Sequence, residues 1–207
     1  MRIDAYFDIV CPFSFLAKRN LEAAIARHPD LGVEVHMHPH MLYPHIPLES
    51  HDFRAFFVAK YGEGLRVPMW ERVTEMGRRA GIAFDFHGIT KGPHAIHAHR
   101  LVAFAKRHGK QAPVLDAVYS AFFEQGRDVG DHAVLVEIGA AQGLPEGELA
   151  AFMAGREEFD ALFAATERQS RAGINAMPTH FVNGTRIQGE SEPGMFDRLF
   201  QALKQVA

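Results

Sequence analysis

The sequence predicts an α/β protein in which two short units of mixed strand and helix enclose a long helical segment. Residues 2–8 alternate apolar and polar side chains as a strand does, and the residues from 12 onward repeat with a helical period. Near the C-terminus, Asn183-Gly184 joins two strand-like segments in the manner of a tight hairpin. Residues 41–175 carry helical periodicity without a convincing strand. We therefore expect a β-α-β unit, an all-helical insertion and a β-β-α unit, in that order.

The first unit begins with the strand at residues 2–8 and continues into a helix whose first residue is Pro12. Proline suits that position because its missing N–H is not needed there, and this places Cys11 at the N-cap. Pro29 ends the helix, and residues 33–38 resume strand alternation. A helix that crosses between two strands implies that the strands are parallel.

The remaining elements are predicted from their periodicity and from the glycines that separate them. Two strands at 179–182 and 185–188 flank the hairpin turn, and a last helix runs from about Pro193 to Val206. Helices are expected in the insertion at roughly 50–61, 67–80, 93–108, 112–125, 131–142, 146–154 and 156–173.

The composition is that of an ordinary globular protein, with 207 residues, 47% of them hydrophobic and 23% charged. A net charge of −3 gives no electrostatic reason to expect a nucleic acid or an anionic membrane as partner. No apolar run approaches the ~18 residues of a membrane span, and the N-terminus lacks the apolar run of a secretory signal. We expect a cytoplasmic protein, and a homodimer is plausible on general grounds.

Cys11 is the only cysteine, and it lies where a strand turns into a helix. Free N–H groups and the helix dipole at a helix start favour a thiolate, so we expect Cys11 to be ionised near neutral pH. Without a second cysteine the chain cannot form an internal disulfide. An outside thiol must therefore resolve any mixed disulfide at Cys11.

The order of elements, with a cysteine opening the first helix and Met177-Pro178 before the third strand, resembles the thioredoxin superfamily. The helical insertion resembles that of its DsbA-like branch, with a thioredoxin-like domain at 1–40 and 176–207 and an insertion domain at 41–175. Within this branch, residues 8–12 look like the opening of FrnE-like disulfide oxidoreductases. Residues 12–17 look like that of kappa-class glutathione transferases and 2-hydroxychromene-2-carboxylate isomerases.

The sequence also departs from both groups. The FrnE-like motif is Cys-x-x-Cys, but Ser14 stands at its second cysteine position. The isomerase group has serine at the first position, where this chain has Cys11, and many relatives have Asn-Thr where this chain has His94-Ala95.

Three functions follow from the resemblance. The leading one is a FrnE-like thiol oxidoreductase that acts through a single thiolate in the motif Cys-Pro-Phe-Ser. The first alternative is a glutathione-dependent isomerase or transferase that acts on an aromatic small molecule. The second is a non-catalytic binding module, whose cysteine would titrate like a free one, with a pKa of about 8.5.

The resemblance also implies roles for individual residues. Ser14 would hydrogen-bond the Cys11 sulfur, and a cis bond at Met177-Pro178 would present backbone groups to a thiol partner. The N–H groups at Glu190 and Ser191 could hold a carboxylate of glutathione, although either residue could simply cap the last helix. The implied catalytic residues are Cys11, Ser14 and Pro178, and the implied residues that bind glutathione or another thiol partner are Pro12, Phe13, His94, Met177, Glu190 and Ser191.

Thirteen histidines raise the question of a metal site. His36, His38 and His40 could share one strand face, but no Cys–His or His-Glu-x-x-His spacing exists, so we expect no metal. His94 and His97 lie one helical turn apart, and a histidine near the cysteine could stabilise its thiolate or move a proton. For His97 an inward-facing, structurally satisfied ring is favoured. We expect no tightly bound cofactor, and glutathione could serve as a cosubstrate.

Overall fold

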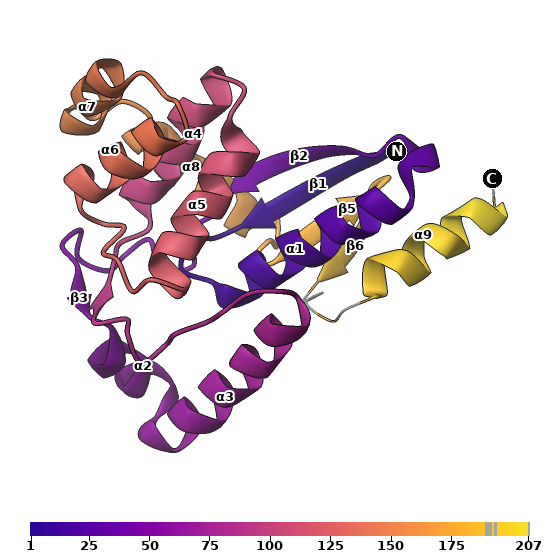
Figure 1. Cartoon of the computed structure of the whole chain (residues 1–207), viewed down its shortest axis with the longest axis horizontal. Coiled ribbons are helices and arrows are strands. Elements are labelled where there is room, and N and C mark those ends of the chain that lie inside the picture. Colours follow the sequence, from indigo (N-terminus) through magenta and orange to yellow (C-terminus); the bar gives the residue numbers. More distant parts are fainter. Residues whose placement is uncertain (189–191, 193, 207) are drawn as a thin grey trace.

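A four-stranded mixed sheet forms the centre of the N- and C-terminal units in the computed structural model, which describes residues 1–188, 192 and 194–206 (Figure 1). The strand order is β2-β1-β5-β6, in which β1 pairs parallel with β2 and antiparallel with β5. Helix α1 makes the crossover between β1 and β2, and it packs against α9. The elements of these two units are β1 (Arg2–Phe7), α1 (Pro12–Arg27), a 3₁₀ turn (Pro29–Leu31), β2 (Glu34–Pro39), β5 (Thr179–Val182), β6 (Thr185–Gln188) and α9 (Met195–Val206).

The C-terminal hairpin forms as the sequence predicts. Asn183 and Gly184 both have positive φ angles, 47° and 84°, as a two-residue turn that matches the twist of its strands requires. The turn is tied to the first strand, because the Asn183 side-chain oxygen accepts a hydrogen bond from the Arg2 backbone N–H.

The insertion is mostly helical, as expected, but it also contains a two-stranded antiparallel sheet. This corrects the prediction of an all-helical segment: His51 pairs with Gly92, and Asp52 with Lys91. Two-residue strands are too short to show an alternating pattern in the sequence. The elements of the insertion are β3 (His51–Asp52), α2 (Phe53–Tyr61), α3 (Glu63–Arg79), β4 (Lys91–Gly92), α4 (Ile96–Arg107), α5 (Gln111–Phe123), α6 (His132–Ala141), α7 (Glu146–Ala154) and α8 (Phe159–Arg171).

The largest hydrophobic core crosses from the sheet into the insertion. Phe7, Phe15 and Leu16 belong to the same cluster of buried side chains as Leu101 and Phe122 of the insertion helices. In Figure 1, α4–α8 gather on one side of the molecule, while α2 and α3 lie below them. A smaller cluster packs α1 and α9 against the sheet.

Arg100 on α4 is fully buried and organises the end of a neighbouring helix. Its guanidinium donates to the main-chain carbonyl oxygens of Phe152, Met153, Gly155 and Glu157, at 2.6–3.2 Å. These carbonyls lie at and beyond the C-terminal end of α7, where helical partners run out. One buried cation thus replaces the missing hydrogen-bond donors.

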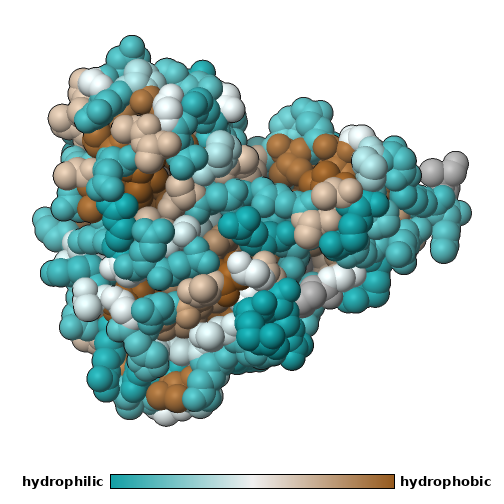
Figure 2. All heavy atoms as spheres, viewed as in Figure 1, coloured by the Kyte–Doolittle hydropathy of each residue, from teal (hydrophilic) through white to brown (hydrophobic). Residues whose placement is uncertain are grey.

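The molecular surface in the view of Figure 2 is mostly hydrophilic, with apolar residues gathered in separate patches. The exposed large hydrophobic residues among those described are Leu48, Tyr61, Leu65 and Val67, around α2 and the start of α3. No helix in the described ranges is long and apolar enough to cross a membrane.

Candidate active site

Cys11 lies at the N-cap of α1, as the sequence predicts. Its backbone is extended, with φ −101° and ψ 109°, and Pro12 is the first residue of the helix. The turn is closed by two main-chain hydrogen bonds, from the Cys11 N–H to the Asp8 carbonyl and from the Ser14 N–H to the Cys11 carbonyl. The end of β1 therefore places the sulfur at the N-terminus of a helix.

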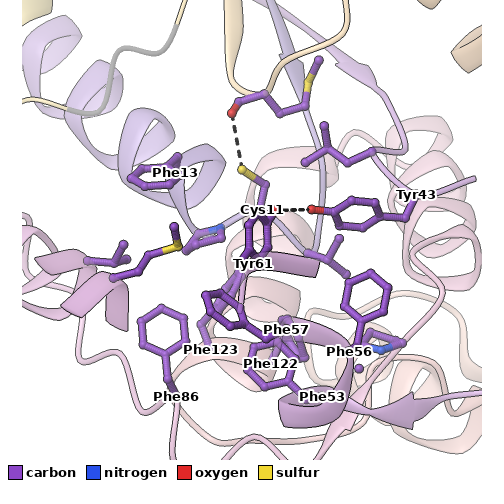
Figure 3. A pocket seen from close by; sticks show the side chains of 18 of the residues that line it. Cys11, Phe13, Tyr43, Phe53, Phe56, Phe57, Tyr61, Phe86, Phe122 and Phe123 are labelled. Atoms are coloured by element: carbon purple, nitrogen blue, oxygen red, sulfur yellow. Dashed lines mark hydrogen bonds between the residues drawn. The ribbon is translucent and has the colours of Figure 1, made fainter. Parts of the chain in front are cut away.

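The Cys11 thiol faces the backbone of the Met177-Pro178 segment. Its Sγ donates to the carbonyl oxygen of Met177 at 3.4 Å, and the peptide bond between Met177 and Pro178 is cis (Figure 3). Cys11 is only 5% exposed and forms a small apolar cluster with Ile174 and Met177. Cys11 and Met177, which the resemblance implies as site residues, are 166 residues apart in the chain and lie in contact here.

Burial raises the pKa of the Cys11 thiol to about 11. Hydrogen bonds from the Ser14 hydroxyl and from the backbone N–H groups of Ser14 and Phe13 act in the opposite direction, while the carboxylate of Asp8 raises the pKa further. The expectation of a thiolate at neutral pH is therefore wrong for the free protein. The helix start favours the negative charge, but the loss of water costs more. A protonated thiol is also what donates to Met177.

Asp8 is a fully buried carboxylate just before the turn. Its Oδ2 accepts from the Leu42 N–H at 2.7 Å, and its Oδ1 lies 3.1 Å from Nε2 of the buried His99. Its main-chain carbonyl accepts from the Tyr119 hydroxyl, and its N–H donates to Ser14 Oγ at 3.3 Å. Sequence reasoning missed Asp8, His99 and Tyr119. The available signal was an acidic residue at the end of a buried strand, three positions before the cysteine.

A pocket of about 330 Å³ opens in front of the thiol. Cys11, Pro12 and Phe13 line one side of it, and aromatic side chains from the insertion line the other (Figure 3). None of the described residues that line it is Asp, Glu, Lys or Arg. The aromatic residues include Phe53, Phe56, Phe57, Trp70, Phe86 and Phe122.

Two tyrosines of this pocket hydrogen-bond to each other. The hydroxyl oxygens of Tyr43, in the loop after β2, and Tyr61, at the end of α2, are 2.7 Å apart (Figure 3). Burial strongly raises the pKa of Tyr43, so this hydroxyl stays protonated at neutral pH. The Lys60 Nζ lies 4.5 Å from the centre of the Tyr43 ring. The bond ties α2 to the loop that follows β2.

Comparison with known proteins agrees with this geometry. The sequence model of the family described as DSBA-like thioredoxin domain matches residues 2–201. This chain belongs to that family. Membership confirms the expected DsbA-like thioredoxin fold and implies thiol–disulfide oxidoreductase or related isomerase chemistry without a tightly bound cofactor.

Solved structures of DsbA-like proteins are similar over the whole chain. A crystal structure of a probable DsbA oxidoreductase from Streptomyces coelicolor has 26% identity and a TM-score of 0.88, and the match covers 99% of this chain and 89% of that one. A 2-hydroxychromene-2-carboxylate isomerase has 15% identity and a TM-score of 0.73, covering 100% and 96%. Cytosolic disulfide reductase DsbM from Pseudomonas aeruginosa, solved with GSH, has 23% identity and a TM-score of 0.72, covering all of both chains.

The histidines singled out in this DSBA-like chain do not line the pocket. His94 is buried, its Nδ1 accepts from the Ile96 N–H at 3.1 Å, and burial lowers its pKa. His97 contacts His132, 3.1 Å away between ring nitrogens, and burial followed by the His132 charge lowers its pKa to about 4. The histidine that is linked to the cysteine turn is His99, through Asp8.

The three histidines at the end of the second strand have partners of their own in the DSBA-like sheet. His36 contacts Glu34, His38 contacts Asp4 at 2.8 Å, and His40 contacts Gln169 at 2.8 Å. No group of three or more potential metal ligands occurs in the part of the chain that the structure describes. The residues predicted to hold a glutathione carboxylate, Glu190 and Ser191, lie outside the described residues.

Proposed function

We propose that the protein is a thiol oxidoreductase that exchanges disulfides through the single thiol of Cys11, with glutathione as the external thiol that completes the cycle. The observation that carries this proposal is the position of the sulfur. It lies at a helix N-terminus, 3.4 Å from the Met177 carbonyl oxygen, and it opens into a pocket. The Met177 backbone is suited to align an extended thiol partner beside the sulfur. The name of the DsbM structure, a disulfide reductase solved with GSH, supports the choice of glutathione.

The raised pKa of Cys11 favours the reducing direction. Strongly oxidising thiol proteins draw their driving force from a stabilised thiolate in the reduced form. In this structure burial raises the pKa of Cys11 to about 11, so the reduced form lacks that stabilisation. We therefore place the protein among reductases and thiol transferases rather than oxidases.

The proposed cycle balances without a second protein cysteine. The Cys11 thiolate attacks one sulfur of a substrate disulfide, a new S–S bond forms, and the other sulfur leaves as a thiolate that takes a proton from solvent. A glutathione thiolate then attacks the mixed disulfide at the substrate's sulfur and releases Cys11. The substrate leaves as a mixed disulfide with glutathione, which a second glutathione reduces in solution.

The pocket itself supports a second candidate function, that of a glutathione-dependent isomerase or transferase. Its aromatic lining, with no charged side chain among the described lining residues, suits an aromatic small molecule. In that mechanism the reacting sulfur belongs to glutathione, and the neutral thiol of Cys11 acts only as a hydrogen-bond donor.

One experiment distinguishes these functions. The protein is incubated with glutathione disulfide, the adduct at Cys11 is measured by intact-mass spectrometry, and glutathione-dependent reduction of a small dialkyl disulfide is assayed for wild type and Cys11→Ser. The proposal expects an adduct and turnover in wild type and neither in Cys11→Ser. Turnover of a chromene-type substrate that survives in Cys11→Ser would favour the isomerase. A protein with no adduct and no turnover would be a binding module, and the proposal would be wrong.

A further inference from the structure

A second cavity lies behind the cysteine turn, between the sheet and helices α1 and α5. Its volume is about 150 Å³, and among the described residues it shares no lining residue with the front pocket. The cysteine motif and the Met177-Pro178 segment each contribute residues to both the front pocket and the rear cavity. Cys11 and Met177 line the front pocket, while Ser14 and Pro178 line this rear cavity. Ser14 therefore stands between the thiol and the rear cavity.

The rear cavity is lined by charged side chains, Lys18 and Glu22, which the front pocket lacks among its described lining residues. Lys18 is 8% exposed and its Nζ donates to Glu22 and, at 2.7 Å, to Asp116. His180 is 2% exposed, and its Nδ1 has no hydrogen-bond partner among the described residues. Asp116, which binds Lys18 but does not line the cavity, also has an Oδ1 without a partner among the described residues.

Buried polar atoms of this kind find their partners in the protein or in ordered water. One water molecule needs roughly 10–15 Å³ of cavity, so the rear cavity, with about 150 Å³, has room for several. Burial lowers the pKa of His180 to about 4, so its ring is neutral at pH 7, and its free nitrogen is a suitable partner for water.

We propose that the rear cavity is a hydration site whose water molecules, acting through the Ser14 hydroxyl, stabilise the thiolate form of Cys11. This inference rests on the proposed function and deepens it. It explains how a thiol that faces a pocket without charged lining residues is ionised for attack. The water solvates the charge and takes no part in bond making.

The geometry at Ser14 supports this role. Its Oγ accepts a hydrogen bond from the Asp8 N–H, and its hydroxyl proton can be donated either to the Cys11 sulfur or to the Tyr119 oxygen, which also lines the cavity. A second lone pair on Oγ remains for a water donor in the cavity, and a chain of hydrogen bonds strengthens each of its members. Among the described residues, Asp8, Tyr43 and Tyr119 interact electrostatically with Cys11, and none of the three is a cation that would attract the thiolate.

The test is to fill the cavity. Ala112→Leu, on the cavity side of α5, adds three carbons to the space, and Ala117→Leu is the matched control on the same helix, outside both cavities. Alkylation of Cys11 by iodoacetamide is measured across pH below the thiol pKa. We expect Ala112→Leu to slow alkylation about tenfold at each pH, which corresponds to a pKa raised by about one pH unit, and Ala117→Leu to leave the rate unchanged. Equal rates for wild type and Ala112→Leu would overturn the proposal.

A crystal structure of the wild-type protein that resolves ordered water gives a second readout, which does not depend on the variants folding. We expect water within hydrogen-bond distance of His180 Nδ1 and Ser14 Oγ, and a dry cavity would overturn the proposal. Alkylation requires only the thiol. Absence of the glutathione adduct would therefore reject the proposed function alone, whereas a dry cavity or an unchanged alkylation rate would reject the hydration site alone.

Discussion

Replacing Ser14 with alanine tests the electrostatics of the site most directly. The substitution removes the hydroxyl whose hydrogen bond lowers the Cys11 pKa. A hydrogen bond to a charged group contributes about 1.5–3 kcal/mol, and one pH unit corresponds to about 1.4 kcal/mol. Ser14→Ala should therefore raise the Cys11 pKa by about one to two pH units and reduce the thiolate fraction ten- to a hundredfold. It also leaves the buried N–H of Asp8 without its acceptor, at a cost of about 1–3 kcal/mol of folding stability.

The assay is the rate of Cys11 alkylation by iodoacetamide as a function of pH. Below the thiol pKa the logarithm of the rate rises linearly with pH. The two proteins should therefore give parallel lines whose vertical separation is the change in thiolate fraction. Ser50→Ala is the matched control, because it also loses a serine hydroxyl that donates to an anionic group, here the carboxylate of Asp128, at a site outside the pocket. Superimposed lines for Ser14→Ala and wild type would refute the role given to Ser14.

Three further predictions concern stability. Arg100→Met should lower the free energy of unfolding by about 3–5 kcal/mol, because it leaves buried carbonyls at the end of α7 without donors. Urea titrations measure this change, and a loss below about 1 kcal/mol would contradict the prediction. Gly139→Ala should lower the free energy of unfolding by about 1–3 kcal/mol, since the new Cβ would lie 2.3 Å from Leu149 Cδ2. Gly147→Ala, which has open space around it, should instead raise the free energy of unfolding by about 0.5–1 kcal/mol. Melting temperatures of the two variants that move in the same direction would contradict this packing. Burial lowers the pKa of His180 to about 4 in the folded protein, whereas the unfolded chain has an ordinary value of about 6.5. Between these two pH values the unfolded chain binds more protons than the folded protein. The folding stability present above about pH 6.5 is therefore lost progressively as the pH falls from about 6.5 to about 4. We expect about 2 kcal/mol less stability at pH 5 than at pH 7 from this residue, and His180→Phe should remove that part of the pH dependence.

Much of the fold could be predicted because its signals are local. The alternation of residues 2–8, the proline at the helix start and the Asn183-Gly184 turn each report on their own neighbours. The pair β3 and β4 was missed because two residues cannot show a period. The meeting of Cys11 with Met177 came from the resemblance, since no local pattern joins positions so far apart.

The ionisation of Cys11 was predicted wrongly for a physical reason. Its position at a helix N-terminus is visible in the sequence, but the depth of its burial is not. Desolvation depends on the whole environment, here on side chains from α2, α3 and α5 that close around the pocket. Asp8, His99 and Tyr119 form their network for the same reason: each is buried by elements distant in sequence, and nothing in their spacing indicates it.

The lining of the front pocket has a consequence for which part of a substrate can approach the sulfur. An ionised group that enters gives up its hydration shell and finds no oppositely charged side chain among the described lining residues, at a cost of several kcal/mol. If glutathione is the external thiol, as proposed, its charged ends should therefore stay at the entrance, and only its cysteine should reach inward. An uncharged aromatic group meets no such penalty. Under the proposed function, we therefore expect the pocket to distinguish the two sides of a mixed disulfide by their charge, before either has reacted.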